Sequence, residues 1–244
     1  MIERQIAIAT RDGATTTFIT HPERGGPHPV ILFYMDAPAI REELRDMARR
    51  LASAGYYVML PNLYYRSGVM ELSELGPMAE TARRERMFAL MESLSIPLIM
   101  SDTEALLAFA GDDPAAASGA IGAVGYCMSG QYAINAATHF ERVAAAASIY
   151  GVRLVTEQDD SPHLAGARTQ AELYFACAEI DHWAPLEMLP PLRESLAASG
   201  ATAEVELYPG VEHGFAFPGR AAYDRDAAER HWERLFALFR RRLA

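Results

Sequence analysis

The sequence predicts an α/β fold with a mostly parallel sheet of about eight strands and helices on both faces. Short apolar runs alternate with longer amphipathic segments along most of the 244 residues. Such alternation is typical of parallel strands that are joined by helices. No internal repeat, low-complexity tract or linker interrupts the pattern, so we predict a single domain over residues 1–244.

The chain is expected to start with a hairpin. Residues 4–20 read as two short strands around Asp12-Gly13, a strong signal for a tight turn. The apolar run 29–36 is too short for a helix and suits a strand that is buried on both faces. The elements expected after it are a helix over 40–54, a strand over 56–60, helices over 77–95 and 97–109, a strand over 119–126, a helix to about 139, strands over 143–151, 171–178 and 203–209, and helices over 185–199 and 223–243.

Two of these helices carry an apolar stripe at helical spacing, which predicts the face that each one buries. In the helix over 40–54 the stripe consists of Leu44, Met47, Ala48 and Leu51. In the last helix it consists of Ala228, Trp232, Leu235, Phe239 and Leu243.

Charge and composition narrow the range of partners. Twenty-two basic and 32 acidic residues give a formal net charge of −10, which argues against a nucleic-acid partner. No apolar stretch approaches the roughly 20 residues that a membrane span needs. The N-terminus carries charges where a signal peptide needs an apolar core, and two cysteines cannot build a disulfide framework. We therefore expect a cytoplasmic protein, either a monomer or a small homo-oligomer.

The segment GYCMSG, residues 125–130, joins a predicted strand to a predicted helix. It differs from the G-x-S-x-G turn of serine hydrolases because the nucleophile position holds Cys127 and the last glycine is Ser129. A strand-to-helix turn this tight strains its central residue and requires small neighbours. At the start of a helix, the dipole favours a thiolate and the N–H of Met128 can point at a developing oxyanion. Cys127 is therefore interpreted as a nucleophile, the alternative being a buried structural cysteine.

A cysteine nucleophile needs a histidine base and an acceptor that orients it. In triads on such sheets the chain order is nucleophile, acid, histidine, and the partners lie on loops at the carboxyl ends of strands. Two predicted loops qualify, one with Glu179, Asp181 and His182 and the other with Glu212 and His213. Chain order favours Asp181 as the acid and His213 as the base, with His182 as the competing histidine. The five other histidines are expected to be surface residues or satisfied neighbours, and none shows metal-ligand spacing. Cys177 falls inside a predicted strand and is expected to be a buried filler.

Nearly the whole chain resembles the dienelactone hydrolase family of α/β-hydrolases. The resemblance rests on GYCMSG, on Asp181 in IDHWAP, on His213 in EHGF and on the run GYYVMLPNLYYR. It implies the α/β-hydrolase fold, with Cys127 as nucleophile, His213 as base and Asp181 as the residue that orients it. It also implies a supporting acid after the first core strand, where this chain has Asp36 in place of the family's glutamate. The N–H of Ala37 would then be the second oxyanion donor.

The substrate-binding positions depart from the family pattern. Dienelactone hydrolase holds its substrate's carboxylate with two arginines, and the resemblance matches one of them loosely to Arg84. Phe217 falls where the family has the other arginine. Tyr64, Trp183 and Phe217 are therefore expected to line a more apolar pocket, the alternative being that they are packing residues.

These observations predict a hydrolase that cleaves small ester or lactone bonds through a cysteine thioester, with no cofactor and no metal. A carboxylesterase or thioesterase of broader specificity, and a non-catalytic member that binds a ligand, are the alternatives. A thiol-dependent redox role ranks lower, since the chain has no C-x-x-C pair.

Overall fold

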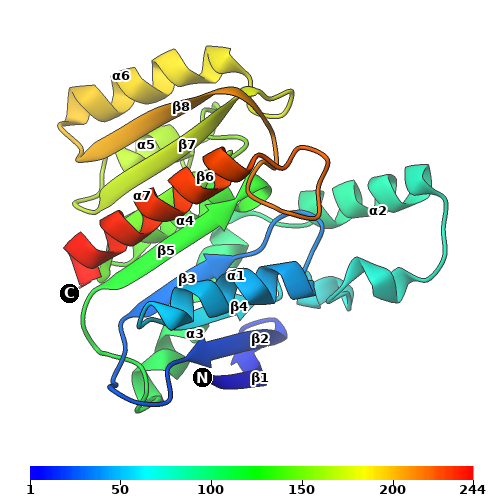
Figure 1. Cartoon of the computed structure of the whole chain (residues 1–244), viewed down its shortest axis with the longest axis vertical. Coiled ribbons are helices and arrows are strands. Elements are labelled where there is room, and N and C mark those ends of the chain that lie inside the picture. The colour runs from blue at the N-terminus through cyan, green and yellow to red at the C-terminus, as the bar shows by residue number, and fades with distance from the viewer. Residues whose placement is uncertain (244) are drawn as a thin grey trace. The chain divides into compact units, whose positions relative to one another are not determined.

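The computed structural model describes residues 1–243, and the chain forms two compact units, Met1–Ser118 and Gly119–Ala244 (Figure 1). Within the described residues each unit contributes four strands. That the whole chain acts as one domain stays a prediction.

The first unit combines a hairpin with two further strands. The strand order is β1-β2-β4-β3, with antiparallel pairing on both sides of β2 and parallel pairing between β3 and β4. The hairpin turns where Thr10 pairs with Gly13, as the Asp12-Gly13 signal predicted. The elements of this unit are β1 (Ile2–Thr10), β2 (Gly13–His21), β3 (Val30–Tyr34), α1 (Glu42–Ser53), β4 (Tyr57–Pro61), η1 (Tyr65–Ser67), η2 (Leu72–Leu75), α2 (Glu80–Glu92) and α3 (Ile96–Asp112).

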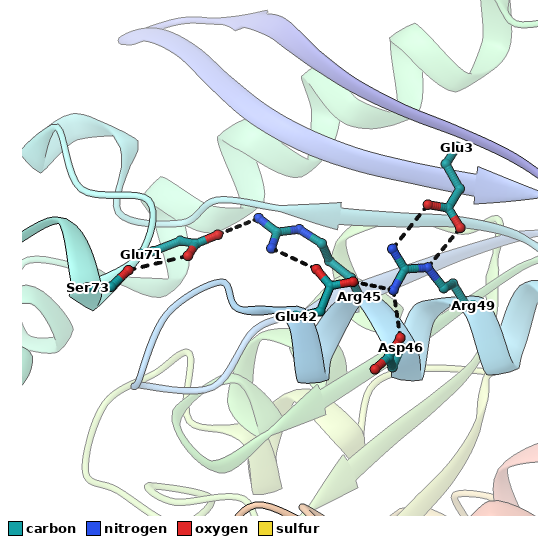
Figure 2. A network of polar contacts seen from close by, with 7 residues as sticks. All are labelled: Glu3, Glu42, Arg45, Asp46, Arg49, Glu71 and Ser73. Atoms are coloured by element: carbon teal, nitrogen blue, oxygen red, sulfur yellow. Dashed lines mark hydrogen bonds and ion pairs between the residues drawn. The ribbon is translucent and has the colours of Figure 1, made fainter.

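Helix α1 packs its predicted stripe against β2 and β4. Leu44, Met47, Ala48 and Leu51 are all buried. The helix begins two residues later than predicted, because the chain first makes a turn in which Ala39 has a left-handed φ of 70°. On the face of α1 that carries its charged side chains, a network of ion pairs links the helix to β1 and to the segment before η2 (Figure 2). Its members are Glu3, Glu42, Arg45, Asp46, Arg49, Glu71 and Ser73.

Helices α2 and α3 differ in how much they bury. In α2 only Leu90 is buried, whereas α3 buries seven residues along its length. Ser95 caps the start of helix α3, and its hydroxyl accepts the N–H of Leu98 at 3.4 Å. Pro97 lies in the first turn, where its missing N–H costs no hydrogen bond. Across the described part of the chain no single helix has the length and apolarity to cross a membrane; only α2 and α3 taken together as a bent pair pass that test.

The second unit is a parallel sheet with the strand order β5-β6-β7-β8. Helix α4 packs on β5 and β6, while α7 lies across the opposite face (Figure 1). Gly122 makes room for α7, since a Cβ there would lie 2.8 Å from the Phe239 ring. Its elements are β5 (Ile121–Tyr126), η3 (Cys127–Ser129), α4 (Gly130–His139), β6 (Val143–Ile149), α5 (Pro162–Gly166), β7 (Glu172–Ile180), η4 (Leu186–Met188), α6 (Leu189–Ser199), β8 (Ala203–Glu212) and α7 (Arg225–Leu243).

The predicted stripe of α7 is buried from Ala228 to Leu243. Helix α6 starts at Leu189 and not near Pro185, because the turn η4 comes first. The five-residue helix α5 was not expected, since it is too short to show a periodic pattern.

Candidate active site

Three predicted site residues follow three strands of the second unit. Cys127 comes directly after β5, Asp181 directly after β7 and His213 directly after β8. Parallel strands bring their carboxyl ends to the same edge of a sheet, which is where open α/β sheets place their sites.

The turn at Cys127 has the strained geometry that its sequence predicted. Cys127 has a φ of 54°, in the left-handed region that non-glycine residues rarely occupy. A Cβ at Gly125 would lie 2.0 Å from the carbonyl oxygen of Ser129, and one at Gly130 would lie 2.2 Å from Ser148 Oγ. Only glycine fits at both positions, because the strand and the helix approach each other closely there. The half-buried side chain of Cys127 is thus held at the apex of the turn.

Backbone hydrogen bonds fix this apex. The carbonyl of Cys127 accepts the N–H of Gly130 and, at 3.1 Å, the N–H of Val152 from the loop after β6. The first residues of the helical segment follow at once, with Met128 next to Cys127 and fully buried.

Asp181, which is buried, and His213, which is partly exposed, form a hydrogen-bonded pair. The Nδ1–H of His213 donates to Asp181 Oδ2 at 2.7 Å. The other carboxylate oxygen, Oδ1, accepts the backbone N–H groups of Trp183 at 2.8 Å and Ala184 at 3.0 Å. The two loops are also joined by a backbone bond of 3.2 Å from His213 to Ile180. The carboxylate is thereby locked in place, and it fixes which ring nitrogen of His213 carries its proton.

Cys127 lies on the other side of the His213 ring and acts on its protonation. Burial disfavours the charged ring, but hydrogen bonds and charge interactions with Asp181 and Cys127 outweigh it and raise the pKa of His213 to about 9. The structure therefore brings Cys127 beside His213, which is hydrogen-bonded to Asp181. At neutral pH this arrangement favours a protonated imidazole beside the sulfur.

The competing acids and the competing base stand outside this arrangement. Glu179 accepts the backbone N–H of Gly210 at 2.6 Å, and both Glu212 and His182 are exposed. Cys177 is buried within β7, and burial raises the pKa of its thiol to about 12, which suits an unreactive filler.

Asp36 and Ala37 belong to the first unit, directly after β3. Asp36 is completely buried and forms a two-pronged ion pair with Arg41, at 2.6 and 3.2 Å. Its carboxylate is therefore paired and shielded from solvent. The carbonyl of Ala37 accepts the hydroxyl of Tyr64 at 2.9 Å, and Arg41 also donates to the carbonyl of Ala39 at 3.2 Å. The segment after β3 is thus held by two side chains.

Two residues that were expected to line a pocket are packing residues. Tyr64 and Phe217 have no exposed surface, so neither offers a face to a substrate. Tyr64 uses its hydroxyl on Ala37, and Phe217 packs against Tyr126 with ring centroids 5.4 Å apart. Trp183 remains half exposed, at 50%. Arg84 lies on the exposed helix α2 with its guanidinium over Phe88.

Arg220 was not predicted as a site residue. Its guanidinium lies over the ring of Phe217, 4.8 Å from the centroid, and beside Gly214, the residue after His213. A Cβ at Gly214 would come within 3.2 Å of Arg220. A cation thus lies beside Phe217, the position for which the resemblance implied an arginine. In the sequence, the only signal is that an arginine stands three positions after Phe217. Only the fold of the loop shows that this arginine stacks on the phenylalanine.

Among residues 1–243, no group of three or more histidine, cysteine, aspartate or glutamate side chains has the arrangement of a metal site.

Known structures share the fold of this chain. A solved structure from Klebsiella pneumoniae, provisionally named a dienelactone hydrolase, matches 98% of this chain and 98% of its own, with a TM-score of 0.87 and 24% identity. A dienelactone hydrolase from Anabaena variabilis matches all of this chain and 99% of its own, with a TM-score of 0.72 and 16% identity. The protein thus has the α/β-hydrolase fold, which confirms the predicted fold class.

The family follows from the sequence. The model of the dienelactone hydrolase family matches residues 15–243. A Methylorubrum extorquens protein provisionally named carboxymethylenebutenolidase is 28% identical over 98% of this chain and 81% of its own length. The carboxymethylenebutenolidase of Pseudomonas putida is 26% identical over 93% of this chain and 92% of its own. The chain belongs to the dienelactone hydrolase family.

Proposed function

We propose that this protein hydrolyses small ester or lactone bonds, enol-lactones among them, with Cys127 as the nucleophile. Membership of the dienelactone hydrolase family supports ester or lactone hydrolysis. The observation that carries the finer proposal is the placing of Cys127 beside His213, whose Nδ1–H donates to Asp181 at 2.7 Å. A thiolate beside a protonated imidazole is the reactive form of a cysteine nucleophile.

The first half-reaction forms a thioester. The Cys127 sulfur attacks the carbonyl carbon, and the carbonyl electrons move onto the oxygen. Backbone N–H groups of Met128 and, by the family resemblance, Ala37 stabilise that oxyanion, each such donor contributing roughly 10²–10³ in rate. The C–O bond then breaks, and the leaving alkoxide or enolate takes the proton of the His213 imidazolium.

The second half-reaction regenerates the enzyme. Neutral His213 takes a proton from water while the water oxygen attacks the thioester carbon. The C–S bond breaks, the carboxylic acid product leaves, and the Cys127 thiolate is again paired with the imidazolium. Asp181 keeps the proton-carrying Nδ1 of His213 fixed through both steps.

We infer that the preferred substrates carry an anionic group, because Arg220 lies beside the residue that follows His213. Its guanidinium is half buried and stacked on Phe217, so its position is fixed before a ligand arrives. A planar guanidinium suits a carboxylate, to which it can donate two parallel hydrogen bonds. The pocket would then be less apolar than the phenylalanine at position 217 suggests.

The experiment compares the wild type with Cys127→Ala and Arg220→Met on p-nitrophenyl acetate and on a carboxylate-bearing enol-lactone. Cys127→Ala should lower kcat/KM by at least about 10³-fold on both substrates. Arg220→Met should raise KM for the anionic substrate about tenfold or more and leave the neutral ester unchanged, so the neutral ester is the control. Full activity in Cys127→Ala would contradict the nucleophile.

Adding a thioester substrate and a peroxide-consumption assay to this experiment separates the alternatives. A broad esterase or thioesterase would hydrolyse neutral esters and thioesters as fast as lactones, whereas a non-catalytic ligand-binding member would turn over none of them. A redox protein would consume peroxide at Cys127.

A further inference from the structure

The loop that follows β6 touches both reacting partners of the proposed mechanism. Strand β6 pairs with β5 on one side and β7 on the other, so its carboxyl end lies between the ends that lead to Cys127 and to Asp181. The loop begins with Tyr150, whose φ of 37° is left-handed. The N–H of Tyr150 donates to the carbonyl of Ala176 in β7 at 2.7 Å. A non-glycine residue keeps such a backbone only where its surroundings hold it there.

On one side the loop is attached to the nucleophile. The N–H of Val152 donates to the carbonyl of Cys127 at 3.1 Å. Gly151 lies against the elbow as well, since a Cβ placed on it would come within 3.3 Å of the Cα of Gly130. A shift of this loop would therefore move the apex that carries the sulfur.

On the other side the loop is packed against the base. The ring of Tyr150 meets the imidazole of His213 edge to face, with centroids 4.9 Å apart and an angle of 61° between the planes. The same ring contacts Phe215 at 5.1 Å. Tyr150 is 1% exposed, so this contact is shielded from water.

We propose that Tyr150 is a positioning residue that sets the separation of Cys127 and His213, with its ring against the imidazole and its loop bonded to the elbow. This inference rests on the proposed function. The bond from Nδ1 to Asp181 restrains one edge of the imidazole, and rotation about that bond has to be limited by packing. The packed ring of Tyr150 limits this rotation on one side. A displacement of about 1 Å between reacting groups can lower the rate roughly 10²-fold.

The test measures the reactivity of Cys127 directly, by its rate of alkylation with iodoacetamide near neutral pH, located by peptide mapping. In parallel, kcat and KM are measured on p-nitrophenyl acetate, and the melting temperature is recorded. The variants are Tyr150→Leu, which removes the ring, Tyr150→Phe, which keeps it, and Tyr208→Leu as a matched control. Tyr208 is equally buried and stacks on Phe215 at 5.0 Å.

Tyr150→Leu should slow alkylation and lower kcat by about 10- to 100-fold with little change in KM. Tyr150→Phe should restore both rates to within about threefold of the wild type, because the packed face is retained. Tyr208→Leu should lower the melting temperature as much as Tyr150→Leu while Cys127 keeps its wild-type alkylation rate. If Tyr150→Leu does not fold, Tyr150→Met replaces it, since methionine fills irregular space without a ring.

Wild-type alkylation and kcat in Tyr150→Leu would overturn the inference, and so would equal losses in Tyr150→Leu and Tyr208→Leu. A failure of the proposed function would look different. Cys127→Ala would then remain active, while the alkylation rate of Cys127 in the other variants would still report on Tyr150.

Discussion

The proton on His213 governs the chemistry at the scale of single residues. Its two neighbours act in the same direction, since Asp181 accepts from Nδ1 and Cys127 also raises the pKa of the ring. Together they overcome the cost of burying a charged imidazole and raise its pKa to about 9. Near neutral pH the histidine therefore holds the proton that a leaving group needs.

This shift makes the stability of the protein depend on pH. A folded-state pKa raised above the ordinary 6.5 gives a contribution that is complete below about pH 6.5 and is lost as the pH rises through about 9. Its size is on the order of 3 kcal/mol for this largely buried ring. We expect His213→Gln to lower the melting temperature most near pH 6 and least near pH 10.

Thermal melts of the wild type and the variant across this range provide the measurement. An NMR titration of Asp181→Asn is the control, because removing the carboxylate should move the His213 pKa down from about 9. A difference in melting temperature that grows towards high pH would contradict the assignment.

At the scale of the element, the elbow depends on glycine for space more than for flexibility. At Gly125 the atoms that a Cβ would meet are backbone atoms of Ser129 and Gly130, which cannot move without unwinding the start of α4. At Gly122 the obstacle is the Phe239 ring, a side chain that can adjust. The two glycines of β5 therefore differ in how strictly they are required.

Gly125→Ala should lower the free energy of unfolding by more than about 3 kcal/mol, because a Cβ only 2.0 Å from the carbonyl oxygen of Ser129 cannot be accommodated locally. Gly111→Ala in α3 is the matched control: a Cβ there meets nothing within 4 Å, and alanine should stabilise the helix by up to about 1 kcal/mol. Urea unfolding of both variants gives the comparison. A Gly125→Ala protein of wild-type stability would show that the elbow can relax.

At the scale of the whole molecule, burial is distributed unevenly among the elements. Strands β3, β4 and β5 are buried at every position, while α2 buries only Leu90. Regions with little buried apolar surface open locally at low cost. The least stable segment of the protein should therefore be α2, which carries Arg84.

Amide hydrogen exchange tests this distribution. Amides of α2 should exchange at least about 10²-fold faster than those of the centre of α3, because α3 buries residues along its whole length. Exchange in β5 should occur only with global unfolding. Equal protection of α2 and α3 would show that a partner or a second copy covers α2 in solution.

Much of this molecule was predictable because its signals are local. The alternation of apolar runs and amphipathic segments predicted the strands and long helices, and the glycines of the elbow predicted a strained Cys127. The chain order predicted Asp181 and His213 as partners, and the structure joins their side chains by a hydrogen bond of 2.7 Å; that the two act with Cys127 as a triad stays a prediction.

The features that could not be predicted depend on contacts between residues distant in sequence. The sequence by itself determined the α/β class, the elbow and the three residues proposed to react. These features depend on periodicity, turn residues and strand ends, each of which can be recognised within a short segment. Only the tertiary structure decided that Phe217 is buried, that Arg220 stacks over it and that Tyr150 touches His213. The physical reason is that exposure and ring packing are set by how loops fold back on the sheet, and no spacing of residues along the chain encodes that.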